Sequence, residues 1–185
     1  MLIQNPPDPS VLSQLLYYEA ETGKLFWRQR TPDMFHDGDR SAEHTCSNWN
    51  AKYAGNEAFT GIDKDGYRQG KLFYKRYRAH RVIWAMQTGE WSAEDIDHID
   101  GNPANNKLAN LRAVSHLENQ RNKKRYKNNT TGAAGVVNRN GRWEANITIK
   151  GKRVYLGTFD DFSEALASRK EADLRIGYHK NHGRG

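Results

Sequence analysis

The chain has 185 residues, with 29 lysines and arginines against 22 aspartates and glutamates, a net charge of +7 and a sequence pI near 9.5. This length suits one ordinary domain or two small ones, and the basic balance suits a polyanionic partner. The single cysteine, Cys46, excludes an internal disulfide framework. No apolar run approaches a membrane span, and the first ten residues lack the features of a secretory signal. We therefore expect a cytoplasmic protein that does not bind membranes.

Positive charge is concentrated in the C-terminal part of the chain. Residues 1–100 carry 12 basic and 15 acidic side chains, whereas residues 101–185 carry 17 basic and 7 acidic ones. A solvated basic surface without a ligand would have the same composition, so charge alone leaves both interpretations open.

The N-terminal part predicts alternating short elements. A short helix is expected over Ser10–Tyr18 and a strand over Gly23–Arg28. Thr31–Asn56 has an irregular composition and is expected to be a long loop or an insertion. The segment GYRQGKLFYKRYRA predicts a hairpin, and His80–Gln87 predicts a helix that the following Thr-Gly ends. His80 itself could be either a ligand or a packing residue.

The segment richest in chemistry is IDHIDGNPANNKLANLRAVSHLENQRN, residues 96–122. It predicts a short strand containing Asp97 and His98, a loop rich in Gly, Asn and Pro, and a second strand over Leu111–Val114. Adjacent residues of a strand point to opposite faces, so Asp97 and His98 can meet at one phosphate only through a bulge or at the end of the strand.

A helix is expected directly after the second strand, because Ser115 and Glu118 have the spacing of a capping box. This cap places Asn119 in the first helical turn. A strand, loop, strand and helix in this order can fold back so that Asn119 faces Asp97 and His98.

These residue types fit phosphodiester hydrolysis. The reaction needs a hard cation on oxygen ligands and a base that deprotonates the attacking water. Asp97 and Asn119 supply oxygens, and the neutral imidazole of His98 supplies the base. Taken singly, each residue is more often structural than catalytic, because Asn-rich loops stabilise turns through side-chain hydrogen bonds. The spaced set in its strand and helix context favours catalysis.

The motifs DHIDGNPANN, NLR and ENQRN resemble the HNH endonucleases, specifically the phage homing-endonuclease branch. The resemblance extends over roughly residues 17–125 and implies a ββα-metal nuclease core. It implies that Asp97 and Asn119 bind one Mg²⁺ or Mn²⁺ per active site and that His98 is the general base. It also implies that Asn110 pins the loop and is not a ligand.

A basic stretch, RNKKRYK, follows the motif and runs into the polar sequence NNTTG. Its dense positive charge predicts a clamp on the phosphate backbone. We expect these side chains to contact DNA: Arg121, Lys123, Lys124 and Arg125. The expected domains are a nuclease domain over residues 1–125, a linker over 126–130 and a DNA-binding domain over 131–185.

The last part of the chain predicts three strands and a helix. The strands are AGVVN, RWEANITI and RVYLGTF, and the helix spans Ser163–Ile176, with a capping box at Asp161 and Glu164. In the second strand the apolar side chains fall on one face: Trp143, Ala145, Ile147 and Ile149. The other face is polar: Arg142, Glu144, Asn146, Thr148 and Lys150.

Residues 131–178 resemble the ethylene-response-factor (AP-two) DNA-binding domain, through GVVNRNGRWEANI and YLGTF. The resemblance implies a three-stranded sheet on the major groove, with DNA contacts from Arg139, Arg153 and Tyr155. Further contacts are expected along the polar face and the second hairpin: Arg142, Lys150 and Lys152. The family's target sequence is not expected here, because Ala134, Val137 and Thr148 stand where plant domains carry arginine. A solvated sheet face without a partner is the alternative.

The sequence therefore predicts an α+β protein that cuts double-stranded DNA as a monomer with little sequence preference. Phage or mobile-element origin and action in the bacterial cytoplasm are implied by the resemblance to homing endonucleases. Two alternatives remain open: a non-catalytic DNA-binding regulator on a degenerate HNH scaffold, and an RNA-directed or structure-specific nuclease.

Overall fold

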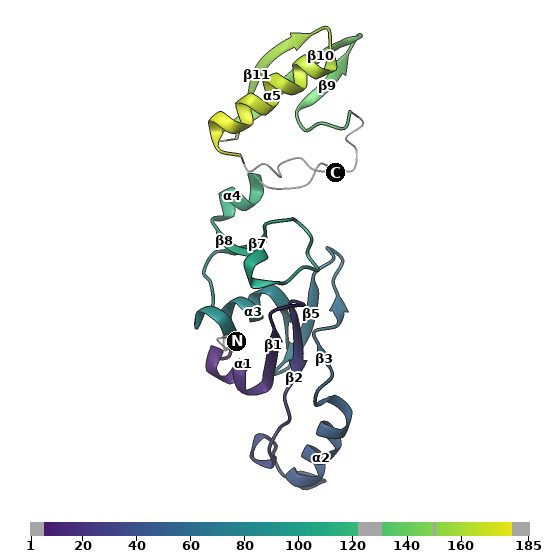
Figure 1. The fold of residues 1–185 in the computed structure, drawn as a ribbon, viewed down its shortest axis with the longest axis vertical. Coiled ribbons are helices and arrows are strands. Elements are labelled where there is room, and N and C mark those ends of the chain that lie inside the picture. Colours follow the sequence, from purple (N-terminus) through teal and green to yellow (C-terminus); the bar gives the residue numbers. More distant parts are fainter. Residues whose placement is uncertain (1–5, 122–130, 150, 179–185) are drawn as a thin grey trace. The chain divides into compact units, whose positions relative to one another are not determined.

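The computed structural model describes residues 6–121, 131–149 and 151–178. The chain divides into two compact units, Met1–Val114 and Ser115–Gly185, which are described separately (Figure 1). Both combine helices with small antiparallel sheets, which confirms the α+β class. No helix in these three ranges is long and apolar enough to cross a membrane.

The N-terminal sheet of the first unit has three short antiparallel strands, in the order β1 (Leu16–Glu19), β2 (Lys24–Trp27) and β3 (Glu57–Ala58). Helix α1 (Pro9–Leu15) precedes it. The helix expected over Ser10–Tyr18 is therefore too long, because the chain is already extended at Leu16. Tertiary contacts override local preference here: Leu16 pairs with Trp27, and the Tyr18 hydroxyl is hydrogen-bonded to a distant loop.

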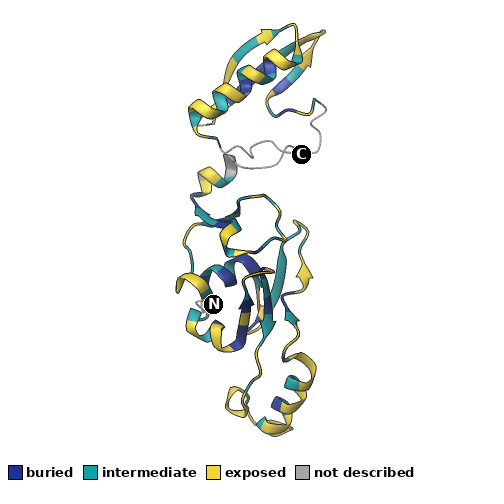
Figure 2. Cartoon of the chain, viewed as in Figure 1, coloured by how far each residue is buried: buried dark blue, intermediate teal, exposed yellow. Residues whose placement is uncertain are grey.

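The expectation of a long loop over Thr31–Asn56 is wrong, because this segment contains helix α2 (Ala42–Tyr53) as well as the short 3₁₀ helix η1 (Pro32–Met34). Trp49 of α2 packs edge-on against Trp27, and the Arg30 guanidinium lies 3.8 Å from a Trp49 ring centroid. Most of α2 is exposed (Figure 2), so its sequence shows no continuous apolar stripe from which a helix could be predicted.

The second sheet contains the predicted hairpin and has the order β4 (Gly61–Ile62), β5 (Arg68–Leu72) and β6 (Lys75–Arg78). Helix α3 (Ala79–Thr88) follows directly and ends at Gly89, which adopts the left-handed conformation with φ 83°. The hairpin and the helix expected from the sequence are both confirmed.

The hairpin that carries the candidate site consists of β7 (Asp95–His98), the 3₁₀ helix η2 (Leu108–Asn110) and β8 (Leu111–Val114). The two strands are antiparallel, with His98 opposite Leu111. Both strands were expected in this place, and they are confirmed.

One apolar core joins the elements of the first unit. Its members come from α1, the first two sheets, α3 and the β7–β8 hairpin, and they include Leu12, Leu16, Leu25, Leu72, Val82, Ile83, Ile96 and Leu111. Burying one side chain of this size contributes about 1.5–3 kcal/mol. Through Ile96 and Leu111, the hairpin is anchored in the same core as the N-terminal sheet.

The second unit begins with helix α4 (His116–Arg121) and contains a three-stranded antiparallel sheet followed by a helix (Figure 1). The sheet has the order β11 (Lys152–Phe159), β10 (Arg142–Ile149) and β9 (Val136–Arg139), and helix α5 (Phe162–Ile176) packs on it. Asp161 caps α5 by accepting hydrogen bonds from Ser163. The predicted three strands and helix are confirmed.

The alternation predicted for β10 is observed with one exception. Ala145 and Ile147 are buried, and Trp143 packs against Phe162 at 4.8 Å between ring centroids. Asn146 was expected on the solvated face but is only 6% exposed. Its side-chain amide donates to Glu144, and its carbonyl oxygen accepts a hydrogen bond from the buried Arg169.

Substitution of two glycines can test how closely the β1–β2 turn approaches the loop after His98. At Gly23 (φ 73°), a Cβ atom would lie 2.6 Å from the backbone nitrogen of Lys107, whereas at Gly55 (φ 79°) it would meet nothing. We expect Gly55→Ala to lower the free energy of unfolding by about 1–2 kcal/mol, the strain of a left-handed residue. Gly23→Ala should cost roughly twice as much in urea denaturation. Equal losses would contradict the close approach.

Candidate active site

Asp97 and His98 enter different surroundings because successive side chains of β7 alternate between its faces. His98 is buried, with 4% exposure, whereas the Asp97 side chain retains 14%. Although the two residues are adjacent in the chain, their side chains therefore have different neighbours. As the sequence predicted for a regular strand, the two side chains do not point to the same face.

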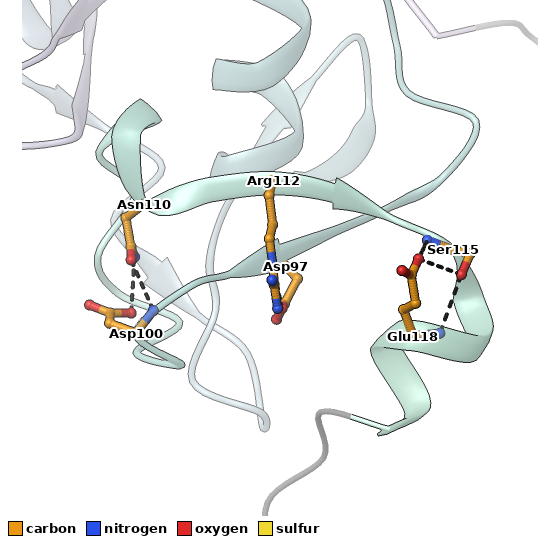
Figure 3. Close-up of polar contacts among 6 residues, drawn as sticks. All are labelled: Asp97, Asp100, Asn110, Arg112, Ser115 and Glu118. Carbon is orange, nitrogen blue, oxygen red and sulfur yellow. Dashed lines mark hydrogen bonds and ion pairs between the residues drawn. The ribbon is translucent and has the colours of Figure 1, made fainter. Parts of the chain in front are cut away.

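Asp97 is paired with Arg112 across the hairpin (Figure 3). Both Nη2 and Nε of Arg112 donate to the same carboxylate oxygen, Oδ2, at 2.8 and 3.2 Å. A partly buried, charge-assisted pair of this kind holds the carboxylate in one orientation. Sequence reasoning missed Arg112, although the antiparallel register of the two predicted strands was the signal that could have found it.

His98 is hydrogen-bonded through Nε2 to Oδ1 of Asn106, at 2.9 Å. An amide oxygen can only accept, so this contact places the proton of a neutral His98 on Nε2 and leaves the lone pair on Nδ1. Nδ1 is therefore the basic atom of the ring. Asn106 is 1% exposed and was not singled out from the sequence, where it is one asparagine among several.

Two further rings surround His98. The Tyr67 centroid lies 5.7 Å away, and the His80 ring meets His98 edge-on at 5.0 Å. Tyr67 precedes β5, and no sequence signal links it to His98, which lies 31 positions later in the chain. His80, whose role the sequence left open, lies in the first turn of α3 and contacts the predicted base directly.

Burial keeps His80 neutral. Desolvation, together with the nearby His98, Arg78 and Arg81, lowers the pKa of His80 to about 3. Its Nδ1 atom is buried and has no hydrogen-bond partner among the described residues. His80 therefore adds no positive charge beside His98 near neutral pH.

The loop between β7 and β8 is closed by Asn110 (Figure 3). Its side-chain amide donates to Asp100 and to the carbonyl of Asn105, and its own oxygen accepts from the Asp100 backbone nitrogen. Partial burial would raise the pKa of Asp100, but hydrogen bonds from Asn102, Asn105 and Asn110 outweigh this and lower it. These contacts are those of a residue that pins a loop.

The N-terminal sheet supports the same loop. The Tyr18 hydroxyl donates to the carbonyl of Asn106 at 3.3 Å and accepts from the backbone nitrogen of Leu108 at 2.8 Å. Asn106 is thus held from both sides, by its side chain at His98 and by its backbone at Tyr18. The contact spans 88 residues of sequence, so no local pattern could predict it.

Asn119 lies near the start of α4, in the second unit. The predicted capping box is observed: Glu118 accepts hydrogen bonds from the Ser115 nitrogen and hydroxyl, and Ser115 Oγ accepts from the Glu118 nitrogen (Figure 3). Asn119 continues this turn by donating its backbone N–H to Ser115. Its role as a metal ligand beside Asp97 stays a prediction.

The predicted ligands fit a hard cation by their chemistry. Over residues 6–121, 131–149 and 151–178, no three His, Cys, Asp or Glu side chains lie together as a metal site. One carboxylate from Asp97 and one amide oxygen from Asn119 suit Mg²⁺ or Mn²⁺, which take oxygen ligands and retain several waters. They do not suit a structural zinc site.

The predicted DNA contacts of the second unit lie in a charged network on its sheet. Glu144 pairs with Arg139 at 3.0 Å and with Arg153 at 3.5 Å, and Arg142 pairs with Asp160. Lys152, at the start of β11, is exposed, and the Tyr155 hydroxyl is hydrogen-bonded to the Thr158 hydroxyl. The other predicted contacts lie outside the described residues or side chains: Arg121, Lys123, Lys124, Arg125 and Lys150.

Comparison with known proteins identifies the class. The family model described as HNH endonuclease matches residues 77–121, which run from β6 to α4 and include Asp97, His98, Asn110 and Asn119. The chain therefore carries an HNH endonuclease domain, and this part of the sequence resemblance is confirmed.

The comparison also gives a relative. The chain is 41% identical over 86 residues to Protein 3.8 of Escherichia phage T7, a match that covers 45% of this chain and 71% of that protein. It belongs to the same family as Protein 3.8. A solved structure describing DNA binding and cleavage by the HNH homing endonuclease I-HmuI matches with a TM-score of 0.40 and 21% identity, over 96% of this chain and 94% of that one.

Burial of His80 predicts a pH-dependent stability. An unfolded histidine gains its proton near pH 6.5, whereas folded His80 does so only near pH 3. As pH falls through this window, the unfolded chain binds more protons, so the folded state loses about 1.4 kcal/mol per pH unit through this group. His80→Phe should flatten that dependence in urea denaturation between pH 7 and 4. Tyr67→Phe, on the neighbouring ring, should retain it. Identical slopes for wild type and His80→Phe would contradict the assignment.

Proposed function

We propose that this protein is a metal-dependent DNA endonuclease. The observation that carries the proposal is the environment of His98. Within the segment that matches HNH endonucleases, this histidine is buried, is oriented by a hydrogen bond to Asn106 and directly follows Asp97 in the chain. An imidazole held in one orientation suits a general base, and the carboxylate of the preceding residue suits a metal ligand.

In the proposed reaction, Nδ1 of His98 accepts a proton from water while Nε2 remains bonded to Asn106. The hydroxide oxygen bonds to phosphorus, and the bond to the 3′ oxygen breaks. The departing 3′ oxygen takes a proton from a solvent water, which leaves a 5′ phosphate and a 3′ hydroxyl. Asp97 and Asn119 would hold Mg²⁺ or Mn²⁺. When bound, such a cation would neutralise charge on the phosphate and on the departing oxygen.

Other residues position Asp97 and His98 and do not themselves react. Arg112 orients the Asp97 carboxylate, and Asn110 fixes the loop that carries Asn106. Neutral His80 places no positive charge next to the His98 ring.

In this proposal DNA is bound by the second unit, including its basic stretch RNKKRYK. In this proposal its three-stranded sheet acts as an ethylene-response-factor-type DNA-binding domain, and the chain acts as a monomeric phage homing endonuclease. One site cuts one strand, so a monomer nicks duplex DNA unless it repositions or a second copy binds. Phage origin is supported by the relationship to Protein 3.8 of phage T7.

A non-catalytic DNA-binding regulator is the rival, and one observation favours it. Arg112 donates two hydrogen bonds to Asp97, the carboxylate that would bind the metal. A guanidinium that stayed on this oxygen would compete with a cation. The rival therefore predicts DNA binding without cleavage.

Cleavage of supercoiled plasmid decides between the two. We expect nicking with Mg²⁺ or Mn²⁺ and a loss of at least about 100-fold for His98→Ala, because the general base is removed. His44→Ala makes the same change at an exposed position on α2 and should retain wild-type activity.

Cleavage that persisted in His98→Ala or in excess chelator would overturn the mechanism. Binding without cleavage by the wild type in either metal would support the regulator. A preference for single-stranded or branched substrates in the same assay would indicate a structure-specific nuclease.

In the proposal, the basic stretch binds phosphates of any sequence and the sheet distinguishes one DNA sequence from another. The salt dependence of binding can test this division. We expect Lys123→Ala with Lys124→Ala to weaken binding to all sequences and to lower the salt slope by about 2, because two phosphate contacts are removed. Arg153→Ala should instead reduce the preference among sequences by about 1–3 kcal/mol. Arg175→Ala, at an exposed position of α5, is the matched control and should change neither. Identical effects of the lysine and Arg153 changes would contradict the division.

A further inference from the structure

Two aromatic side chains project from the tip of the β5–β6 hairpin. Phe73 is 55% exposed, and Tyr74 is 102% exposed, the largest value among the exposed large hydrophobic residues of the described chain. They form the two-residue loop between Leu72 and Lys75, which pair across the hairpin. Leu72 is buried, so the hairpin is anchored in the core while its tip extends into solvent.

The backbone at this tip is unfavourable for the residues that occupy it. Phe73 has φ 48° and Tyr74 has φ 64°, and two positive φ values are typical of a type I′ turn. Asn-Gly or Asp-Gly normally fills these positions, because bulky side chains disfavour the left-handed region. Tyr74 gains no burial in return, and Phe73 remains more than half exposed. Strain that persists without a packing benefit points to a functional role for the rings.

The same hairpin carries an unbalanced pair of charges. Lys71 lies directly opposite Arg76 in the register, and like charges in this position destabilise a sheet. The next cation along, Arg78, is neutralised by Asp63 and Asp65. Lys71 and Arg76 are both exposed and have no acidic partner among the described residues. An anionic ligand would relieve their repulsion.

The distal part of the hairpin is also narrow. Strand β4 pairs only with Arg68 and Gln69, so the ribbon beyond them consists of two strands. A two-stranded ribbon fits into a groove of B-form DNA. Bases offer flat faces to aromatic rings, and phosphates offer charge to cations.

From these features we infer that the Phe73–Tyr74 tip is a DNA wedge, whose rings stack against a base step of duplex DNA while Lys71 and Arg76 bind the flanking phosphates. The inference rests on the proposed function, since it adds a contact from the nuclease unit to the same substrate. It places a DNA contact in the part of the chain whose net charge is negative.

A double substitution separates a binding role from a structural one. Phe73→Asn with Tyr74→Gly removes both rings and installs the preferred type I′ sequence. We expect the urea midpoint to rise while affinity for duplex DNA falls about tenfold, measured by fluorescence anisotropy of the full chain in excess chelator, where no cutting occurs. The swap Phe73→Tyr with Tyr74→Phe retains both rings and should keep wild-type affinity.

Mismatched DNA provides a second readout. A mismatched step costs less to unstack, so the wild type should bind a mismatched duplex several-fold more tightly than a paired one. The Asn-Gly variant should lose this preference. Lys71→Gln with Arg76→Gln should keep the preference but lower the salt slope by about 2.

Several outcomes would overturn the wedge. One is an Asn-Gly variant with unchanged affinity for DNA. A second is an Asn-Gly variant that loses both DNA affinity and stability. A third is an Asn-Gly variant that still binds DNA but no longer binds anionic lipid vesicles, because the tip would then contact lipid instead. If the wild type cleaves DNA and the Asn-Gly variant binds equally well, only the wedge is wrong. If the wild type binds no duplex DNA, the proposed function fails together with it.

Discussion

The antiparallel pairing of β7 with β8 is the constraint on which the candidate site depends. This register sets Asp97 opposite Arg112 and His98 opposite Leu111, so adjacent residues enter an ion pair and a buried aromatic cluster respectively. A slip by one residue would expose His98 and bury Asp97. Asn110 closes the loop between the strands, and Ile96 ties the hairpin to the core. The chemistry of the two residues is therefore a property of the hairpin as a whole.

Burying the Nε2 atom of His98 is costly unless it is hydrogen-bonded, and two contacts provide and hold its partner. Asn106 binds the His98 ring, and the Tyr18 hydroxyl holds the backbone of Asn106. The N-terminal sheet thus helps to position the hydrogen-bond partner of a histidine located 80 residues later in the chain. His80 packs against the His98 ring as a neutral side chain, because burial lowers its pKa far below that of a free histidine.

Charge counted along the sequence differs from charge presented by the folded surface. The C-terminal part has a large excess of cations, yet Glu144 binds both Arg139 and Arg153 on the sheet of the second unit. The N-terminal part is acidic overall, yet its β5–β6 hairpin presents Lys71 and Arg76 without acidic partners among the described residues. Net charge averages over a segment, whereas a ligand meets the local arrangement that strand register produces.

Local pattern by itself determined the elements with a clear period or cap: the β7–β8 strands, the Ser115 cap, α3 up to Gly89, and the alternating strand around Ala145. It also determined the spacing of Asp97, His98, Asn110 and Asn119, on which the HNH assignment rests. Only tertiary structure decided where α1 ends, that exposed α2 forms, and that Arg112, Asn106, Tyr67 and Tyr18 support the site. The physical reason is range: capping and alternation act within a few residues, whereas pairing across sheets and hydrogen bonds to buried rings join residues up to 90 positions apart.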